Sequence, residues 1–481
     1  TNGDVSFGMT VNSSEALSRL STPAALTVTA GSGAVTFTGI VGGASYTSTT
    51  PTTTGAVGAV IVNSTALTKF GGSVSAASVT TNAGGSVELF GNVTTTGGAQ
   101  TYNDAVTLKN DMVVTGSTVS FLDAVTGGGK ALTITGNAVL GNGGVADTVA
   151  GVATLSVSGT SSVGASLIDT LSSQTFTGAI TLTADAELKG VGLKLLGAVN
   201  GAKALILTDS GTTEISGAIG AGTALTSLEV KGGGIVKLAG ITIKTSGTQT
   251  YSKAVELLAN TTLEGSTVST GSTLTGLNGS TNYGLTVTGN AAFGDGTDAD
   301  ALTGLTTLSV SGNAALNLGA ITTSGTQTYS GNVSLAKTVS LTTTNNNIGI
   351  TGTLNGGFNF TATVGTANVT LTGAVGGSTP LGAVLLSSSG VMTFGSSVAA
   401  TSLTTNTNGT VYLGGNVTTT TSQTYNDAIV LTNDVVLTGT DITLAQTVNS
   451  DATGTKRALT VTGSGVTTFS GIVGGTVALA S

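Results

Sequence analysis

The sequence predicts an all-β fold, a parallel β-solenoid (right-handed β-helix) built from diverged repeats of about 75–96 residues. Three observations predict it. The chain repeats itself along its length, its apolar and polar residues alternate in short runs, and its composition favours strands around a narrow core.

The clearest repeat joins two segments that lie far apart. "QTYNDAVTLKNDMVVTG" begins at Gln100 and "QTYNDAIVLTNDVVLTG" begins at Gln423, and 12 of the 17 positions are identical. A Gln-Thr-aromatic sequence, called the marker triplet below, begins at five places: Gln100, Gln174, Gln249, Gln327 and Gln423. Successive marker triplets lie 74, 75, 78 and 96 residues apart. Self-similarity on this scale is typical of repeat architectures.

The two ends of the chain also resemble each other. "ALTVTAGSGAVTFTGIVGG", ending at Gly43, reappears as "ALTVTGSGVTTFSGIVGG", ending at Gly475. Both segments look like interior repeats and not like the atypical repeats that usually cap such arrays. We therefore expect residues 1–481 to form one continuous array that is a slice of a longer chain.

Each repeat contains runs in which apolar and polar residues alternate. Between Gly247 and Gly325 these runs are "TYSKAVELL", "TTLEGSTVS", "YGLTVTGNAAF" and "TTLSVSGNAALNLG". A period of two bounded by turn residues predicts strands, and no window keeps the i, i+3, i+4, i+7 pattern of a helix. Four runs in about 76 residues give about 19 residues per run, which we take as the length of one coil.

Stacking explains why the sequence has to repeat. The strand edges of a coil stay unpaired until the next coil covers them. Hydrophobic residues are 39% of the chain but aromatic residues only 4%, so small and branched side chains must fill the interior. The alternative fold is a tandem of β-sandwich domains, for which 11 Phe, 7 Tyr and no Trp are few.

Charge and cysteine content exclude several function classes. The chain has 14 Lys and Arg against 22 Asp and Glu, a formal net charge of −8, so we expect no nucleic-acid partner. The lack of Cys excludes disulfides and thiolate metal sites. Apolar runs such as Ala59–Val62 are far shorter than the about 18 residues of a membrane-spanning helix, so we expect no transmembrane segment in this stretch.

The repeats that carry "GTQTYSGNVSLAKTVSLTTT", "ALTVTGSG" and "TTFSGIVGG" resemble the β-strand repeats of giant bacterial surface and exported proteins. These proteins are filamentous-haemagglutinin-like and autotransporter-like adhesins, some of them surface-layer-like. The resemblance covers essentially all 481 residues and is one of repeat style. It implies an extracellular or bacterial cell-surface location and a structural or adhesive stalk that mediates attachment or contact between cells or with a matrix.

Two other functions stay open at this point. One is a self-assembling subunit of a surface layer or an extracellular matrix filament, whose partners are other copies of the array, or its own continuation, stacked end to end. The other is ice binding, which needs a flat Thr-x-Thr ladder in consecutive coils. We expect no enzyme activity, because the chain has neither His nor Cys and no cluster of acids and bases stands out.

One candidate metal site is visible. "GDGTDADAL" places Asp295, Asp298 and Asp300 within six residues, and closely spaced oxygen ligands suit calcium. The alternative is a polar corner held by turn hydrogen bonds. The aligned loop from the earlier repeat keeps only Asn142 and Asp147, which favours the corner. We expect no other cofactor.

Two further sets of residues follow the repeats. We interpret four acids as turn caps: Asp104, Asp111, Asp427 and Asp434. The aromatic residues of the marker triplets are Tyr102, Phe176, Tyr251, Tyr329 and Tyr425. At four coils per repeat they would lie roughly 19 Å apart, too far for one sugar-binding platform, so we expect them to plug the core or a corner.

Overall fold

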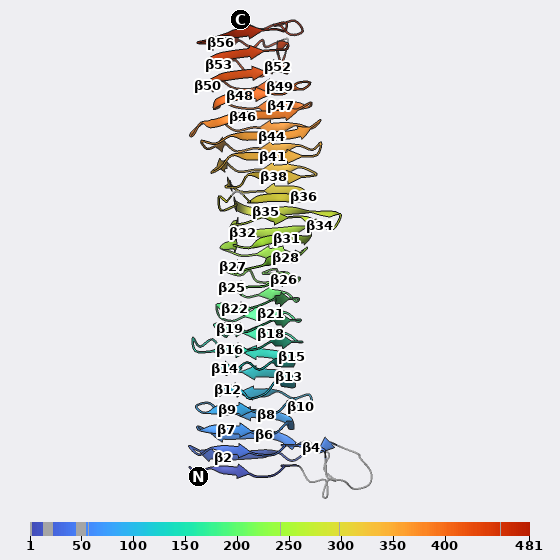
Figure 1. The fold of residues 1–481 in the computed structure, drawn as a ribbon, viewed down its shortest axis with the longest axis vertical. Helices are drawn as coiled ribbons and strands as arrows, with labels where there is room; N and C mark the ends of the chain where they lie inside the picture. The colour runs from blue at the N-terminus through green and yellow to red at the C-terminus, as the bar shows by residue number, and fades with distance from the viewer. Residues whose placement is uncertain are drawn as a thin grey trace. The chain divides into compact units, whose positions relative to one another are not determined.

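The computed structural model describes residues 2–12, 23–44, 54–55, 57–240, 242–297, 299–452 and 454–481, with the side chains of 54, 55 and 278 excepted. Every regular secondary-structure element in this part of the chain is a β-strand (Figure 1). The chain divides into two compact units, Thr1–Val236 and Lys237–Ser481.

One coil of the first unit contains three strands. These are β20 (Gln174–Phe176), β21 (Ile180–Leu182) and β22 (Ala186–Gly190). The next coil consists of β23 (Leu193–Leu195), β24 (Val199–Asn200) and β25 (Ala204–Asp209). Each strand pairs in parallel with its counterpart one coil later, so that Gln174 lies beside Leu193 and Ile180 beside Val199. The predicted coil of about 19 residues and the predicted parallel β-solenoid are confirmed.

The second unit is built in the same way. Here β51 (Ser422–Tyr425), β52 (Ala428–Leu431) and β53 (Val435–Gly439) form one coil. They pair in parallel with β54 (Asp441–Leu444), β55 (Val448–Ser450) and β56 (Leu459–Gly463). Figure 1 shows stacked strands of this kind in the first unit, where β19 (Leu167–Thr170), β22 and β25 lie one above another.

Parallel stacking excludes the tandem β-sandwich, which is built from antiparallel strands. In the described part of the chain, the registers assign antiparallel pairing only to two short pairs. One joins β4 (Gly43–Ala44) to β5 (Thr54–Gly55), and the other joins β34 (Leu277–Asn278) to β35 (Thr281–Phe293).

The core lies inside the coils and follows the predicted alternation. In β25, Leu205 and Leu207 are buried while Ile206 between them is partly exposed. Aromatic residues also stack from coil to coil. The rings of Phe7, Phe37 and Phe70 are 4.8 and 5.2 Å apart and nearly parallel. Buried side chains that stack from coil to coil in this way fill the narrow interior, and at most positions they are small or branched.

The predicted spacing of four coils per repeat is wrong. Gln100 pairs, coil after coil, with the row Val119, Ala138, Ser161 and Ile180. The next marker triplet begins at Gln174, which opens the strand immediately before Ile180. This repeat is therefore one strand short of a whole number of coils.

The second unit shows the same shift twice. Gln249 leads to the row Val268, Ala291, Ala314 and Val333, and Gln327 opens the strand before Val333. Gln327 leads to the row Ile348, Val369, Met392, Val411 and Ile429, and Gln423 opens the strand before Ile429. In each case the marker triplet moves to the neighbouring sheet.

The prediction of four coils per repeat failed because one alternating run of the sequence can contain two strands. The run "TTLEGSTVS" lies in β32 (Thr261–Thr270), which crosses a corner between two sheets. Its first half pairs with β29 (Thr242–Lys244) and its second half with β30 (Thr248–Tyr251). A register shift between Glu264 and Thr267 marks this corner.

Candidate functional site

The marker triplets place a glutamine and a tyrosine side by side in the core. Gln100 is fully buried, and its Nε2 donates hydrogen bonds to the carbonyls of Val93 (3.2 Å) and Thr115 (2.8 Å). Val93 lies on the preceding strand, and Thr115 lies one coil later in the same sheet as Val93. The Tyr102 hydroxyl donates to Gln100 Oε1 at 3.0 Å. The Gln100 side-chain amide thus links its own strand to two strands, one coil apart, that are stacked in the neighbouring sheet.

The same Gln–Tyr pair recurs at three other marker triplets. Tyr251, Tyr329 and Tyr425 donate to the Oε1 of Gln249, Gln327 and Gln423 at 3.0, 3.3 and 3.0 Å. At each of them Nε2 also reaches one carbonyl on the preceding strand and one a coil later. Each buried amide therefore has a partner for both its oxygen and its nitrogen, as a polar group in a core requires.

The remaining marker triplet lacks the hydroxyl. Phe176 replaces tyrosine, and Gln174 Oε1 is buried without a hydrogen-bond partner. Its Nε2 still donates to Ile168 and Lys189. Leaving a buried acceptor unpaired costs about 1–3 kcal/mol, so this site is the weakest version of the arrangement.

Burial explains why these tyrosines act as donors. Desolvation raises the pKa of Tyr102, Tyr251, Tyr329 and Tyr425 far above the ordinary value, so their hydroxyls stay protonated. All four side chains and Phe176 are fully buried. The prediction that the marker aromatics plug the core is confirmed, and they form no exposed platform.

A threonine and a glycine complete the corner beside three of the four pairs, while beside Gln327 the place of the glycine is taken by Thr343. The Thr95 hydroxyl donates to the Gly98 carbonyl at 2.7 Å, and a Cβ atom on Gly116 of the next coil would lie 2.7 Å from the same hydroxyl. Gly265 stands in the same relation to Thr245, also at 2.7 Å. A larger residue at either glycine would displace the hydroxyl, which explains the glycine that follows these strands.

Two equivalent aspartates are buried beside the first and last marker triplets. Asp104 Oδ1 accepts the Gly85 N–H at 2.7 Å, and Asp427 Oδ1 accepts the Gly409 N–H at 2.7 Å. The second carboxyl oxygen of each has no well-formed hydrogen bond, nor have the hydroxyls of Thr81 and Thr405. Both acids cap backbone of the preceding coil, so their interpretation as caps is confirmed.

The environment of Asp104 disfavours its charge. Burial raises the pKa of Asp104 above the ordinary range, and the nearby Asp123 carboxylate adds to the shift. The Gly85 N–H and the Thr81 hydroxyl oppose it without cancelling it.

Asp111 and Asp434 cap the coil that follows. Asp111 Oδ1 accepts the Ala131 N–H at 2.9 Å, and Asp434 Oδ1 accepts the Ala458 N–H at 2.8 Å. The interpretation as caps is confirmed, although the capped groups belong to the next coil and not to the local turn.

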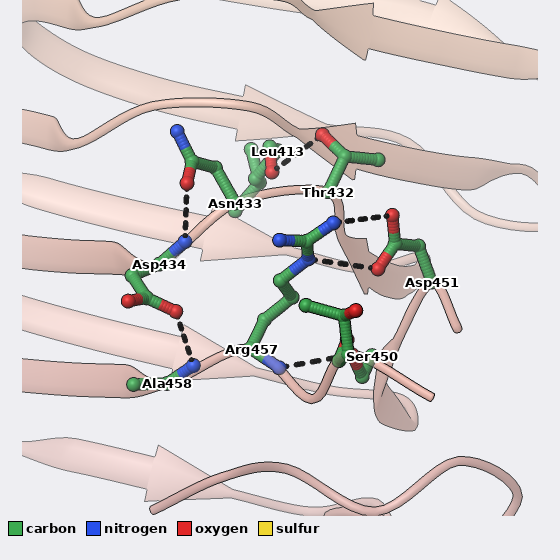
Figure 2. Close-up of polar contacts among 9 residues, drawn as sticks. Leu413, Thr432, Asn433, Asp434, Ser450, Asp451, Arg457 and Ala458 are labelled. Atoms are coloured by element: carbon green, nitrogen blue, oxygen red, sulfur yellow. Dashed lines mark hydrogen bonds and ion pairs between the residues drawn. The ribbon is translucent and has the colours of Figure 1, made fainter. Parts of the chain in front are cut away.

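Figure 2 shows the surroundings of Asp434, where the chain enters its last described coil. Arg457 donates to both carboxyl oxygens of Asp451, from Nε at 2.9 Å and from Nη2 at 3.2 Å. This hydrogen bond lowers the pKa of Asp451. The Arg457 N–H also donates to Ser450 Oγ at 3.0 Å. Together these bonds hold residues 457 and 458 against the coil beneath.

The candidate calcium loop is folded around one of its own acids. Asp300 is buried, and its Oδ2 accepts the Asp295 N–H at 2.8 Å. Asp295 Oδ1 accepts the Thr297 N–H at 3.0 Å, and this bond is the main cause of its lowered pKa. Asp298 lies outside the described residues. The structure thus brings Asp295 and Asp300 together through backbone hydrogen bonds.

The corresponding loop of the first unit uses the same device. Asp147 aligns with Asp300, and its Oδ2 accepts the N–H groups of Asn142 and Gly144 at 2.7 and 2.9 Å. The acid that is kept between the loops is therefore the one that holds the loop. No group of three or more His, Cys, Asp or Glu suited to a metal occurs among the described residues.

Sequence reasoning missed the role of the marker glutamine. Residues i and i+2 of a strand point to the same side, so an inward aromatic at the third position of the triplet predicts an inward glutamine at the first. That signal was available for all five triplets.

The part of the chain that the structure describes contains no helix that could span a membrane.

Comparison with known proteins adds no identity to this geometry. No family model matches the chain, and no curated protein or solved structure matches it.

The Gln–Tyr pair predicts opposite effects for two substitutions. Tyr425→Phe removes the donor to Gln423 and should lower the free energy of unfolding by about 1 kcal/mol, whereas Phe176→Tyr should raise it by a similar amount. Thermal and urea unfolding measure both changes. Tyr412→Phe is the control, since Tyr412 is partly exposed on the outer face of its strand. Equal effects of all three substitutions would contradict the role of the pair.

Asp104 predicts a pH-dependent gain from Asp104→Asn. Because its folded pKa is raised, the carboxyl's contribution to stability is complete below its unfolded pKa of about 3.9 and is lost as pH rises through the folded value. The asparagine stays neutral and supplies a donor for Thr81. We expect the variant to melt above the parent at pH 7 and together with it near about pH 3.5. Asp111→Asn, at an exposed cap, should show no such gain, and a constant difference across pH would refute the explanation.

Calcium is predicted to have little effect on thermal stability, because Asp295 and Asp300 of the candidate calcium loop already accept backbone N–H groups. A bound ion at 100 times its Kd would add about 2.7 kcal/mol to stability. Melting in EDTA and in millimolar calcium should therefore agree closely. A clear rise with calcium that Asp295→Asn abolishes would establish the site and overturn the corner interpretation.

Proposed function

We propose that this chain is a structural and adhesive stalk segment of a large bacterial cell-surface or secreted protein, without catalytic activity. The observation that carries the proposal is the parallel stacking of coil on coil among the described residues of each unit. Each coil covers the backbone edges of the one before it, so the first and last coils of a unit are held apart by a packed core. A rigid spacer needs this property.

The outer surface supports a role in display or contact. One outward row of the second unit runs through Ser340, Thr361, Leu385, Thr404, Thr424, Thr443 and Thr468. Apart from Leu385, the side chains of this row are short, polar and uncharged, so they keep this face hydrated and weakly charged. The chain has 7% charged residues, against about 25% in typical soluble domains.

The same face gives little support to ice binding. Thr361 and Thr363 form one Thr-x-Thr pair, but the neighbouring coils carry Ser340 with Thr342 and Leu385 with Ser387. A continuous Thr-x-Thr ladder, which ice binding requires, is interrupted on both sides of this pair. We therefore do not propose that function.

Surface display can test the stalk. The chain would be placed between a membrane anchor and an epitope tag on an encapsulated bacterial host, with a Gly/Ser linker of 481 residues as the control. Flexible linkers coil back on themselves, whereas stacked coils do not. We expect antibody-coated beads to bind the tag on the solenoid several-fold better. Equal binding to both would contradict the spacer role.

Adhesion is tested separately with beads that carry the purified chain without a tag. Binding of these beads to cells or to matrix above the level of albumin-coated beads would support the adhesive part of the proposal. Binding at the albumin level would leave a spacer alone.

A further inference from the structure

Six exposed asparagines share one place in the coil, directly before the first residue of a strand, and each is followed two residues later by Ser or Thr. We call them the capping sequons: Asn92, Asn260, Asn332, Asn359, Asn368 and Asn416. Alternation along the strand turns the middle residue inward, so the asparagine and the hydroxyl residue lie on the same outer face. In β40 (Val333–Leu335), Val333 is buried while Asn332 and Ser334 are exposed. Asn-x-Ser/Thr on a surface is the acceptor sequence of N-linked glycosylation.

The capping sequons use one half of the side-chain amide and leave the other half free. Asn332 Oδ1 accepts the Thr353 N–H of the next coil at 3.0 Å, and the Oδ1 of the other five accepts a next-coil N–H at 2.8 or 2.9 Å. The Nδ2 of these six donates no hydrogen bond to any described residue. By contrast, Asn63 and Asn408 also begin Asn-x-Ser/Thr, but their Nδ2 donates to a threonine hydroxyl at 3.5 and 3.2 Å. Glycosylation replaces one hydrogen on Nδ2 and keeps the Oδ1 acceptor, so a sugar at a capping sequon leaves the cap intact.

Asparagines that stack in adjacent coils carry the acceptor sequence only once. Asn290, Asn313 and Asn332 cap three successive coils, and only Asn332 is followed at the second position by Ser or Thr. Asn347 and Asn368 form a second stack, in which only Asn368 has the hydroxyl residue. Adjacent coils lie about 4.8 Å apart, which is close to the width of a sugar ring, so sugars on both neighbours would collide. Capping alone makes no such distinction between members of a stack.

We propose that the six capping sequons are sites of N-linked glycosylation. Nδ2 forms a bond to the anomeric carbon of a sugar, the bond from that carbon to a pyrophosphate oxygen breaks, and the displaced Nδ2 proton passes to a base of the transferase. The co-substrate is therefore a glycosyl pyrophosphate, and the partner is a glycosyltransferase. The proposal goes beyond the stalk and does not depend on it, so the display experiment and the sugar analysis can fail independently.

Peptide mass spectrometry of the chain purified from its native source, with electron-transfer fragmentation, tests the assignment. We expect sugar at the six capping sequons. The matched controls are four asparagines that cap the next coil in the same way but lack the hydroxyl residue: Asn137, Asn290, Asn313 and Asn347. These four should be unmodified. Bare asparagines at the six sites, or equal modification of the controls, would overturn the proposal.

The mass of the attached group distinguishes two sources of the donor. Direct transfer from a nucleoside-diphosphate sugar adds single sugars, so chains with one sugar at a site would be found. Transfer from a lipid-linked pyrophosphate adds a preassembled oligosaccharide, so every occupied site would carry the same larger mass. Either result supports the six sites.

A pair of substitutions should move the sugar by one coil. Ser334→Ala removes the hydroxyl residue of Asn332, and Ala315→Thr supplies one two residues after Asn313, where Ala315 is exposed. Neither changes the asparagine that caps the next coil. In the double variant, made in the native source, we expect sugar at Asn313 and none at Asn332. Circular dichroism and melting temperature check folding, and sugar that stays at Asn332 or fails to appear at Asn313 would overturn the proposal.

Discussion

The requirement that every coil be covered in register by the next governs this structure. A coil alone leaves N–H and C=O groups unpaired along three strands and an apolar interior open to water. Covering one coil with another satisfies both needs at once. The alternation of inward and outward residues, the recurrence of short motifs and the scarcity of charge follow from this requirement, because a residue that fits one coil must also fit its neighbours.

Side-chain oxygens extend the same rule to the corners, where strands end and backbone groups lose their partners. Asn313 Oδ1 accepts the Asn332 N–H of the next coil, and Asn332 Oδ1 accepts the Thr353 N–H of the coil after that. Asp111 and Asp434 act alike. The marker glutamine does inside the core what these residues do outside it, since its amide donates to carbonyls of two stacked coils.

The sequence predicted the fold well and the details of the site poorly. The coil of about 19 residues and the inward position of the marker aromatics could be read because period-two alternation reports directly on burial. The size of the repeat in coils could not be read, since β32 bends around a corner inside one alternating run. The partners of Gln100 were also hidden, because Thr115 becomes its neighbour only through the coil register. Asp104 and Asp111 have the same residue type in one motif, yet one is buried and the other is exposed.

The shift of one strand per repeat has a consequence for how such an array can evolve and be recognised. Duplication of one repeat turns its outward residues to a different direction, and with three strands per coil the original direction returns only after three duplications. A ligand that binds one face of the solenoid would therefore meet only every third copy of an outward residue. The other copies lie on the other two faces. Recombination within the gene lengthens the molecule without concentrating any chemical group along one line, so new binding specificity has to arise coil by coil.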